Sequence, residues 1–283
     1  MYDCAIIGSG PAGVSAALTL KALNKNIIWF GSSGLSAKVK NAEKIRNYPG
    51  LSSVTGREMQ MAFLAQIDDM GLKITEKTVT AVCGMGDYYG ILCDQEIFEA
   101  KTVIIAIGVD AVKPIKGELE LMGRGVSYCA TCDGFLYKGK KIAVICTSKD
   151  LEHEIKYLCD LAEEVYLCPL YKDVAVSADN LHIISDMPIE IGGDNRAEKL
   201  IFKDKELSVD GIFMLKAAVA PTVLVTGLQA EDGHVAVDRA CKTNLKGCFA
   251  AGDCTGRPYQ YAKAVGEGNV AAHSVNEFLA SQK

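Results

Sequence analysis

The strongest signal for the fold class is Tyr-Asp-Cys-Ala-Ile-Ile-Gly-Ser-Gly-Pro-Ala-Gly, residues 2–13. Its first six residues form a strand-like, mostly apolar run, and the spacing Gly8-x-Gly10-x-x-Gly13 follows at once. A run rich in Ala and Leu then continues to Leu23, and a second apolar run covers residues 27–30. Strand, tight turn, helix and strand in this order predict a βαβ unit with a parallel sheet.

The glycine turn predicts a dinucleotide site. Glycines let the backbone turn tightly and approach a pyrophosphate, and the N-terminus of the following helix adds roughly half a positive charge. An acidic residue that would bind the ribose is missing after the second strand, because Phe30 is followed by Gly31-Ser32-Ser33. Hydroxyl or main-chain groups are therefore expected to bind the ribose. A glycine-rich loop without a ligand is the alternative interpretation.

Further apolar runs, separated by helix-like segments, continue this alternation. The runs cover residues 102–107, 141–145, 164–168 and 248–251, and the helix-like segments cover residues 150–161 and 261–279. The run that starts at Lys140 is followed by a helical pattern and another strand, so it resembles the beginning of a second βαβ unit. We therefore predict an α/β fold with two nucleotide-binding-type, Rossmann-like domains.

Composition excludes several classes of function. The 283 residues are 49% hydrophobic and 23% charged, as in a globular protein, and the net charge of −5 offers no basic excess for nucleic acid. No apolar run reaches the ~18 residues of a membrane span, and the best candidate, residues 211–226, is interrupted by Lys216 and Pro221. The first residues lack the features of a secretory signal, so a cytoplasmic location is expected.

Eleven cysteines are many for a chain expected in a reducing compartment, where permanent disulfides are rare. Most are expected to be buried thiols, and those in or beside apolar runs are Cys4, Cys83, Cys93, Cys241 and Cys248. Cys129 and Cys132 differ, because the two-residue spacing lets their sulfur atoms meet. The alternative for this pair is a zinc site, but the sequence has no second Cys-x-x-Cys or His pair at a matching spacing. No metal site is predicted.

Four segments together resemble the low-molecular-weight thioredoxin reductase family. They are Gly8–Gly13, Asn47-Tyr48-Pro49-Gly50, Cys129-Ala130-Thr131-Cys132-Asp133-Gly134 and Ala250-Ala251-Gly252-Asp253. The resemblance spans nearly the whole chain and implies FAD as the cofactor. The FAD contacts that it implies are Gly8, Gly10, Pro11, Ala12, Asn47, Gly252, Asp253, Gln260, Tyr261 and Ala262.

The resemblance also implies the chemistry. Two electrons pass from reduced FAD to a disulfide, and the resulting dithiol reduces a disulfide of thioredoxin. By resemblance, Cys132 faces the flavin, Cys129 attacks the partner's disulfide, and Asp133 carries the proton as general acid or base. A homodimer and a small domain that rotates between flavin and substrate are implied in the same way.

The second nucleotide-binding unit departs from the family. Where family members carry a Gly-x-Gly-x-x-Ala turn and a later His-Arg-Arg cluster, residues 140–191 contain no glycine and residues 125–195 no arginine. Residues 150–194 hold eleven Asp or Glu against two lysines. Losing two charge-assisted hydrogen bonds would weaken phosphate binding by about 10² to 10⁴. We therefore expect an electron donor other than NADPH.

Retained and missing motifs together resemble the ferredoxin-dependent flavin thioredoxin reductases, a branch that does not use pyridine nucleotides. Ferredoxin or flavodoxin is then the expected donor, and basic residues between Lys38 and Arg46 are the expected docking patch. Three alternatives remain open: a divergent NADPH-dependent thioredoxin reductase, a dithiol oxidase, and a flavin-binding redox sensor that does not turn over.

We predict an FAD-binding domain built from residues 1–112 and 237–283. A smaller dithiol domain, residues 113–236, interrupts it and has a degenerate pyridine-nucleotide fold.

Overall fold

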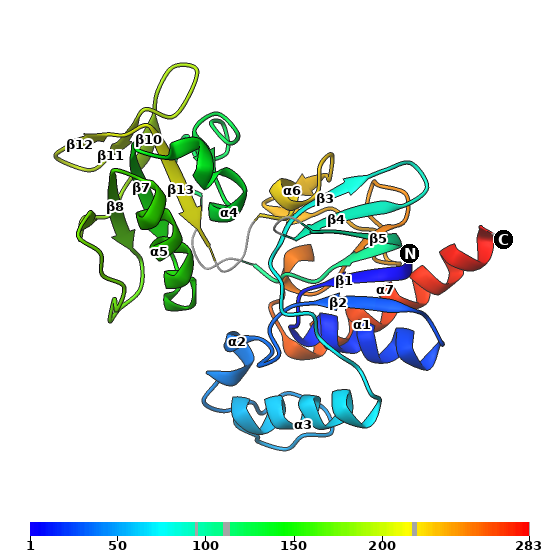
Figure 1. Cartoon of the computed structure of the whole chain (residues 1–283). Coiled ribbons are helices and arrows are strands. Elements are labelled where there is room, and N and C mark those ends of the chain that lie inside the picture. The colour runs from blue at the N-terminus through cyan, green and yellow to red at the C-terminus, as the bar shows by residue number, and fades with distance from the viewer. Residues whose placement is uncertain (94–95, 110–113, 217–219, 283) are drawn as a thin grey trace. The chain divides into compact units, whose positions relative to one another are not determined.

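The computed structural model describes residues 1–93, 96–109, 114–216 and 220–282 (Figure 1). The chain forms two compact units. Unit 1 combines Met1–Val109 with Ala220–Lys283, and unit 2 is Asp110–Val219.

The sheet of unit 1 is mixed. Its strands are β1 (Tyr2–Ile7), β2 (Ile27–Phe30), β3 (Val79–Gly84), β4 (Tyr89–Cys93), β5 (Glu96–Ile105) and β16 (Cys248–Ala250). They lie in the order β2-β1-β5-β4-β3, and β16 also pairs with β5. Strands β1, β2, β5 and β16 are parallel, whereas β3 and β4 extend the sheet as antiparallel strands.

Most helices of unit 1 pack on one face of this sheet, and the short helix beside β3 packs on the other (Figure 1). The helices of unit 1 are α1 (Pro11–Ala22), α2 (Ala37–Lys40), α3 (Gly56–Asp69), α6 (Pro221–Leu224) and α7 (Tyr261–Ser281), and β14 (Ala230–Glu231) pairs with β15 (His234–Val235). Pro11 opens α1, where its fixed φ suits the first helical position. Thr55 and Glu58 form a capping box that starts α3.

Alternate residues of β1 enter the two cores on opposite faces of the sheet. This strand is therefore buried on both sides, as expected in a parallel sheet.

Unit 2 has a parallel sheet of its own. Its strands lie in the order β6 (Val126–Ser127), β13 (Gly211–Leu215), β7 (Lys141–Cys146), β8 (Glu164–Pro169) and β9 (Leu181–Ile183). Helix α5 (Glu152–Leu161) packs on one face and α4 (Ala130–Asp133) lies beside it. An antiparallel sheet of β10 (Glu190–Gly192), β11 (Lys199–Ile201) and β12 (Glu206–Ser208) covers the other face.

The structure confirms the predicted α/β fold with Rossmann-like parallel strands. One boundary lies elsewhere than predicted, because residues 220–236 belong to unit 1. Leu224, Val225 and Leu228 are buried in the core of that unit, and Val225 bridges Val82 of β3. The predicted boundary at residue 112 lies outside the described residues. Within the described chain, no helix combines the length and the apolar character needed to cross a membrane.

Candidate functional site

The predicted dinucleotide turn connects β1 to α1 in unit 1. Gly8 has φ +113°, and a Cβ there would lie 2.2 Å from the carbonyl oxygen of Ala106, so only glycine fits. Gly10 is different, because a Cβ there would meet only the Ser36 Cβ within 4 Å, at 4.0 Å. Gly10 thus leaves space at the N-terminus of a 12-residue helix, which fits the approach of a phosphate group.

The loop after β16 lies against this turn. Gly252 has φ +90°, and a Cβ there would lie 2.9 Å from the Cβ of Ala12 in the first turn of α1. The adjacent Asp253 is half-buried, and its carboxylate makes no hydrogen bond or ion pair with any described residue. Burial raises the pKa of the Asp253 carboxyl, although Lys38 and Lys263 act in the opposite direction. A half-buried acceptor of this kind fits a ligand that carries hydroxyl groups.

Two further segments of unit 1 meet near the start of α7. Asn47 Nδ2 donates to Gln260 Oε1 at 2.6 Å, although 213 residues separate them. The Tyr261 hydroxyl donates to the Lys38 carbonyl oxygen at 3.3 Å. Ala262 is exposed in the first turn of α7. The ten predicted FAD contacts therefore all lie in unit 1, on the β1–α1 turn, the segment around Asn47, the loop after β16 and the start of α7. These features fit FAD.

An acidic residue that was not predicted, Glu76, lies near the end of β2. Ser33 donates from its backbone N–H and its hydroxyl to Glu76 Oε1, at 2.9 and 2.6 Å. These hydrogen bonds lower the pKa of the Glu76 carboxyl. The Ser32 N–H donates to the Ser9 hydroxyl at 3.0 Å. A carboxylate therefore does lie beyond β2, but it comes from 43 residues further along the chain, so no local spacing could reveal it.

The predicted cysteine pair lies in unit 2 and forms a disulfide between Cys129 and Cys132. Cys129 precedes the short helix α4 and is half-buried, whereas Cys132 is exposed on that helix. The backbone N–H of Cys132 lies 3.1 Å from the Cys129 sulfur. Just beyond the pair, Phe135 and Leu136 are 70% and 62% exposed, which leaves an apolar surface next to the disulfide.

Asp133 follows the disulfide and is held by Ser127, a residue that the sequence analysis did not single out. The Ser127 hydroxyl donates to Asp133 Oδ2 at 2.6 Å and accepts from the Cys129 N–H at 3.1 Å. Ser127 is 6% exposed, at the end of β6. One buried hydroxyl therefore joins the carboxylate to the backbone of the first cysteine.

The β7–α5 turn of unit 2 is where a second nucleotide would bind. Two hydrogen bonds lie within the turn: the Asp150 N–H donates to the Ser148 hydroxyl at 3.3 Å, and the Cys146 thiol donates to the Ser148 carbonyl oxygen at 3.2 Å. Glu152 and Glu154 lie in the first turn of α5. Carboxylates there oppose a phosphate, so this turn does not fit a pyridine nucleotide.

Burial agrees with the prediction for Cys4, Cys93, Cys241 and Cys248 but not for Cys83, which is exposed. The last two residues of β3, Cys83 and Gly84, are both exposed, so the predicted packing role of Cys83 is wrong. Burial raises the pKa of Cys4 and Cys248 to about 12.

The chain is similar to known disulfide reductases along nearly its whole length. A family model described as pyridine nucleotide-disulphide oxidoreductase matches residues 2–147 and 175–268. The chain belongs to this family. It is 35% identical to a thioredoxin reductase of Helicobacter pylori, and the alignment covers 99% of each chain.

Two crystal structures of a ferredoxin-flavin thioredoxin reductase from Clostridium acetobutylicum also match over nearly the full length. Their TM-scores are 0.93 and 0.90, with 44% and 48% sequence identity, and each match covers 99% of this chain and 98% of the other. The family members are flavoproteins, so the prediction of FAD is confirmed. The chain is a flavin-dependent disulfide reductase of the thioredoxin reductase type.

Proposed function

We propose that this enzyme passes two electrons from reduced ferredoxin through FAD to the Cys129–Cys132 disulfide, and that the dithiol then reduces thioredoxin. Each turnover consumes two reduced one-electron carriers and two protons, and it produces one thioredoxin dithiol. The observation that carries the choice of donor is the β7–α5 turn, where carboxylates stand in place of a phosphate site.

Two comparisons support this donor. The family model leaves residues 148–174 unmatched, and this stretch contains α5 and β8, the second half of the predicted βαβ unit. Proteins described as ferredoxin-flavin thioredoxin reductases share 44% and 48% of their residues with this chain.

The energetics are sufficient. A ferredoxin near about −400 mV that reduces a thioredoxin-like dithiol near about −270 mV leaves about 130 mV. For two electrons this corresponds to about 6 kcal/mol.

In unit 1 we propose that the ten predicted contacts bind FAD, with Gly10 admitting the pyrophosphate to the N-terminus of α1 and Asp253 accepting from ligand hydroxyls. When bound, FAD supplies the means to collect electrons singly and deliver them as a pair. Glu76, held by Ser33, is positioned to contribute to the ribose site.

In unit 2 we propose that Cys132 receives electrons from the flavin and Cys129 serves the partner. The Cys129 thiolate attacks the thioredoxin disulfide, which breaks that bond and forms a mixed disulfide. The Cys132 thiolate then attacks the mixed disulfide, releases the second thioredoxin thiol and restores the Cys129–Cys132 bond. Asp133, held by Ser127, carries the protons that these thiol steps take up and release. Phe135 and Leu136 offer thioredoxin an apolar contact.

We propose that ferredoxin docks at a basic patch defined as Lys38, Lys40, Lys44 and Arg46. All four side chains are exposed. Lys38 also donates to the Val109 carbonyl oxygen, so Lys40, Lys44 and Arg46 are the better candidates for contact with an acidic carrier. Such complementarity raises the association rate and is weakened by salt.

The test of the donor is anaerobic mixing of the holoenzyme with NADPH, NADH or reduced ferredoxin, followed by flavin absorbance. Reduced ferredoxin should bleach the flavin, and addition of oxidised thioredoxin should restore the colour. Prompt bleaching by stoichiometric NADPH would overturn the proposal. Failure of thioredoxin to reoxidise the flavin would favour a redox sensor.

The test of the patch is charge reversal in the double variant K40E/K44E. We expect slower ferredoxin-driven reduction and a flatter dependence on salt. The matched control is K242E/K246E, which reverses two exposed lysines elsewhere in unit 1. Equal rates of ferredoxin-driven reduction in the two double variants would contradict docking at the basic patch. Homodimer formation is also part of the proposal, and light scattering of the holoenzyme tests it.

A further inference from the structure

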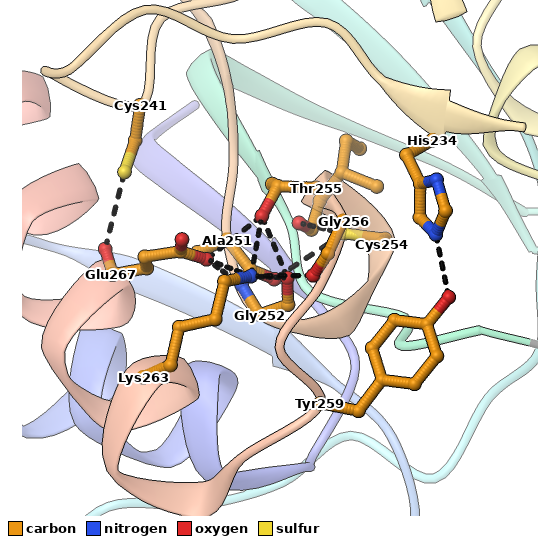
Figure 2. Close-up of polar contacts among 11 residues, drawn as sticks. His234, Cys241, Ala251, Gly252, Cys254, Thr255, Gly256, Tyr259, Lys263 and Glu267 are labelled. Carbon is orange, nitrogen blue, oxygen red and sulfur yellow. Dashed lines mark hydrogen bonds and ion pairs between the residues drawn. The ribbon is translucent and has the colours of Figure 1, made fainter. Parts of the chain in front are cut away.

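The loop Gly252–Gly256 rests on two charged side chains of α7 (Figure 2). Glu267 Oε2 accepts from the Gly252 N–H at 2.8 Å and lies 2.8 Å from the Thr255 hydroxyl. It also forms an ion pair with Lys263 at 3.1 Å. This carboxylate oxygen therefore has three donor groups within reach, two of them from the loop.

Lys263 holds the same loop through its carbonyl oxygens. Its ammonium lies 2.9 Å from the Gly252 oxygen, 2.9 Å from the Gly256 oxygen and 3.0 Å from the Thr255 hydroxyl. An ammonium has three N–H donors, so the two carbonyls and one further acceptor satisfy it. Figure 2 shows both side chains reaching from α7 to the loop.

These contacts leave the Asp253 carboxylate available to accept hydrogen bonds from a ligand. Lys263 and Glu267 bind backbone groups on either side of Asp253, whereas the Asp253 carboxylate makes no hydrogen bond or ion pair with a described residue. Lys263 and Glu267 are one helical turn apart, so helix α7 presents both charges to the loop together. The pair is half-buried, which strengthens its hydrogen bonds relative to an exposed pair.

We propose that Lys263 and Glu267 are positioning residues for the flavin cofactor, which fix the loop so that Asp253 faces the bound group. This inference rests on the FAD role of Asp253 proposed above. Neither charged residue contacts the cofactor in this proposal, and both act through the loop backbone. This role requires an ion pair between positions 263 and 267. It also requires a cation at position 263 that can reach the carbonyl oxygens of Gly252 and Gly256.

The test measures how firmly the holoenzyme holds FAD. The variants are K263M and E267Q, with K263R as the conservative replacement. E277Q is the matched control, because Glu277 is an exposed glutamate on the same helix. After dilution of each holoenzyme, the rise in free-flavin fluorescence gives the rate of FAD release, and the absorbance spectrum reports the flavin environment.

We expect K263M to release FAD about 10- to 100-fold faster, because hydrogen bonds to a charged group are lost. E267Q should show a smaller effect, K263R should recover most of the loss, and E277Q should match the unmodified protein. If K263M does not fold, the comparison of E267Q with E277Q carries the test.

Two outcomes would overturn the inference. One is FAD release and a flavin spectrum unchanged in both K263M and E267Q. The other is a K263R protein as impaired as K263M. Neither outcome depends on the electron donor, so failure of ferredoxin to reduce the unmodified holoenzyme is a separate result that bears on the proposed function.

Discussion

The Ser127 hydroxyl has one hydrogen atom and two acceptors within reach, the Asp133 carboxylate and the Cys129 carbonyl oxygen. It lies 2.6 Å from Asp133 Oδ2 and 3.2 Å from the Cys129 carbonyl oxygen, and it accepts from the Cys129 N–H. The shorter contact identifies the carboxylate as its acceptor, because charge-assisted hydrogen bonds are the shorter and stronger ones. Ser127 therefore holds the Asp133 carboxylate next to the backbone of Cys129.

Replacement of this hydroxyl should slow thioredoxin reduction. In S127A the Asp133 carboxylate loses its donor and the buried Cys129 N–H loses its acceptor, so we expect roughly a tenfold lower rate. From the proton-carrying role proposed for Asp133, D133N should lower the rate further, since general acid–base groups contribute about 10² to 10⁴. Single-turnover reduction of thioredoxin by the prereduced enzyme measures both. S127T keeps the hydroxyl and is the control, and an S127A rate equal to that of S127T would rule out the positioning role.

The first turn of helix α5 binds another segment of the chain through the carboxylate of Glu152. Glu152 Oε1 accepts from the Ala175 N–H and the Tyr171 hydroxyl, both at 2.9 Å. The hydrogen bond from the Ala175 N–H lowers the pKa of the Glu152 carboxyl, and that from the Tyr171 hydroxyl adds to it. The helix N-terminus thus anchors the segment that follows β8.

This anchor should depend on pH. Because the folded protein depresses the pKa of Glu152 below its ordinary value of 4.5, the stabilisation is present above that value and is lost as the pH falls below it. At pH 7, E152Q should expose the Ala175 N–H to faster hydrogen exchange. As the pH falls through the lowered pKa of Glu152, the two proteins should become similar. D160N, which removes an exposed carboxylate of the same helix, is the control. Equal exchange in E152Q and D160N at pH 7 would contradict the anchor.

Elements whose signals are local could be predicted, and those that depend on distant partners could not. The β1–α1 turn follows from the glycine spacing of residues 8–13, and the disulfide from a two-residue spacing. The antiparallel strands β3, β4 and β10–β12 were missed, because pairing of short strands is decided by neighbours elsewhere in the sheet. The contacts Ser33–Glu76 and Asn47–Gln260 span 43 and 213 residues, so no motif contains them.

At the scale of the whole molecule, each unit has its own cores, and unit 2 contains a buried ion pair. Lys216 and Glu118 are 2.6 Å apart, with side chains 3% and 0% exposed. Glu118 also accepts from the Ile115 N–H at 2.9 Å and from the Tyr128 hydroxyl. Ile115 and Lys216 lie near the two ends of the described part of unit 2, and Tyr128 directly precedes Cys129. The Glu118 carboxylate therefore connects both ends to the disulfide segment.

Neutralising Glu118 should destabilise unit 2 selectively. E118Q leaves the Lys216 ammonium buried without a countercharge, which costs about 3 to 5 kcal/mol. For a unit of this size we expect its thermal midpoint to fall by more than about 10 °C. Calorimetry should show this fall in one transition only, while saturating FAD raises the midpoint of the other, because the proposed FAD site lies in unit 1.

A loss of stability in E118Q has two possible causes, the unpaired Lys216 ammonium and the altered hydrogen bonds of residue 118. They can be separated because a buried ion pair need not be stabilising in itself. If the cost comes from the unpaired ammonium, the double variant E118M/K216M should recover most of it, since apolar residues of similar volume often replace a buried pair without loss. E120Q, at an exposed glutamate two residues away, should leave both transitions unchanged. A double variant less stable than E118Q would instead mean that the hydrogen bonds to Tyr128 and Ile115 hold unit 2 together. The disulfide segment should then also become more susceptible to proteolysis, because Tyr128 would have lost its hydrogen bond to Glu118.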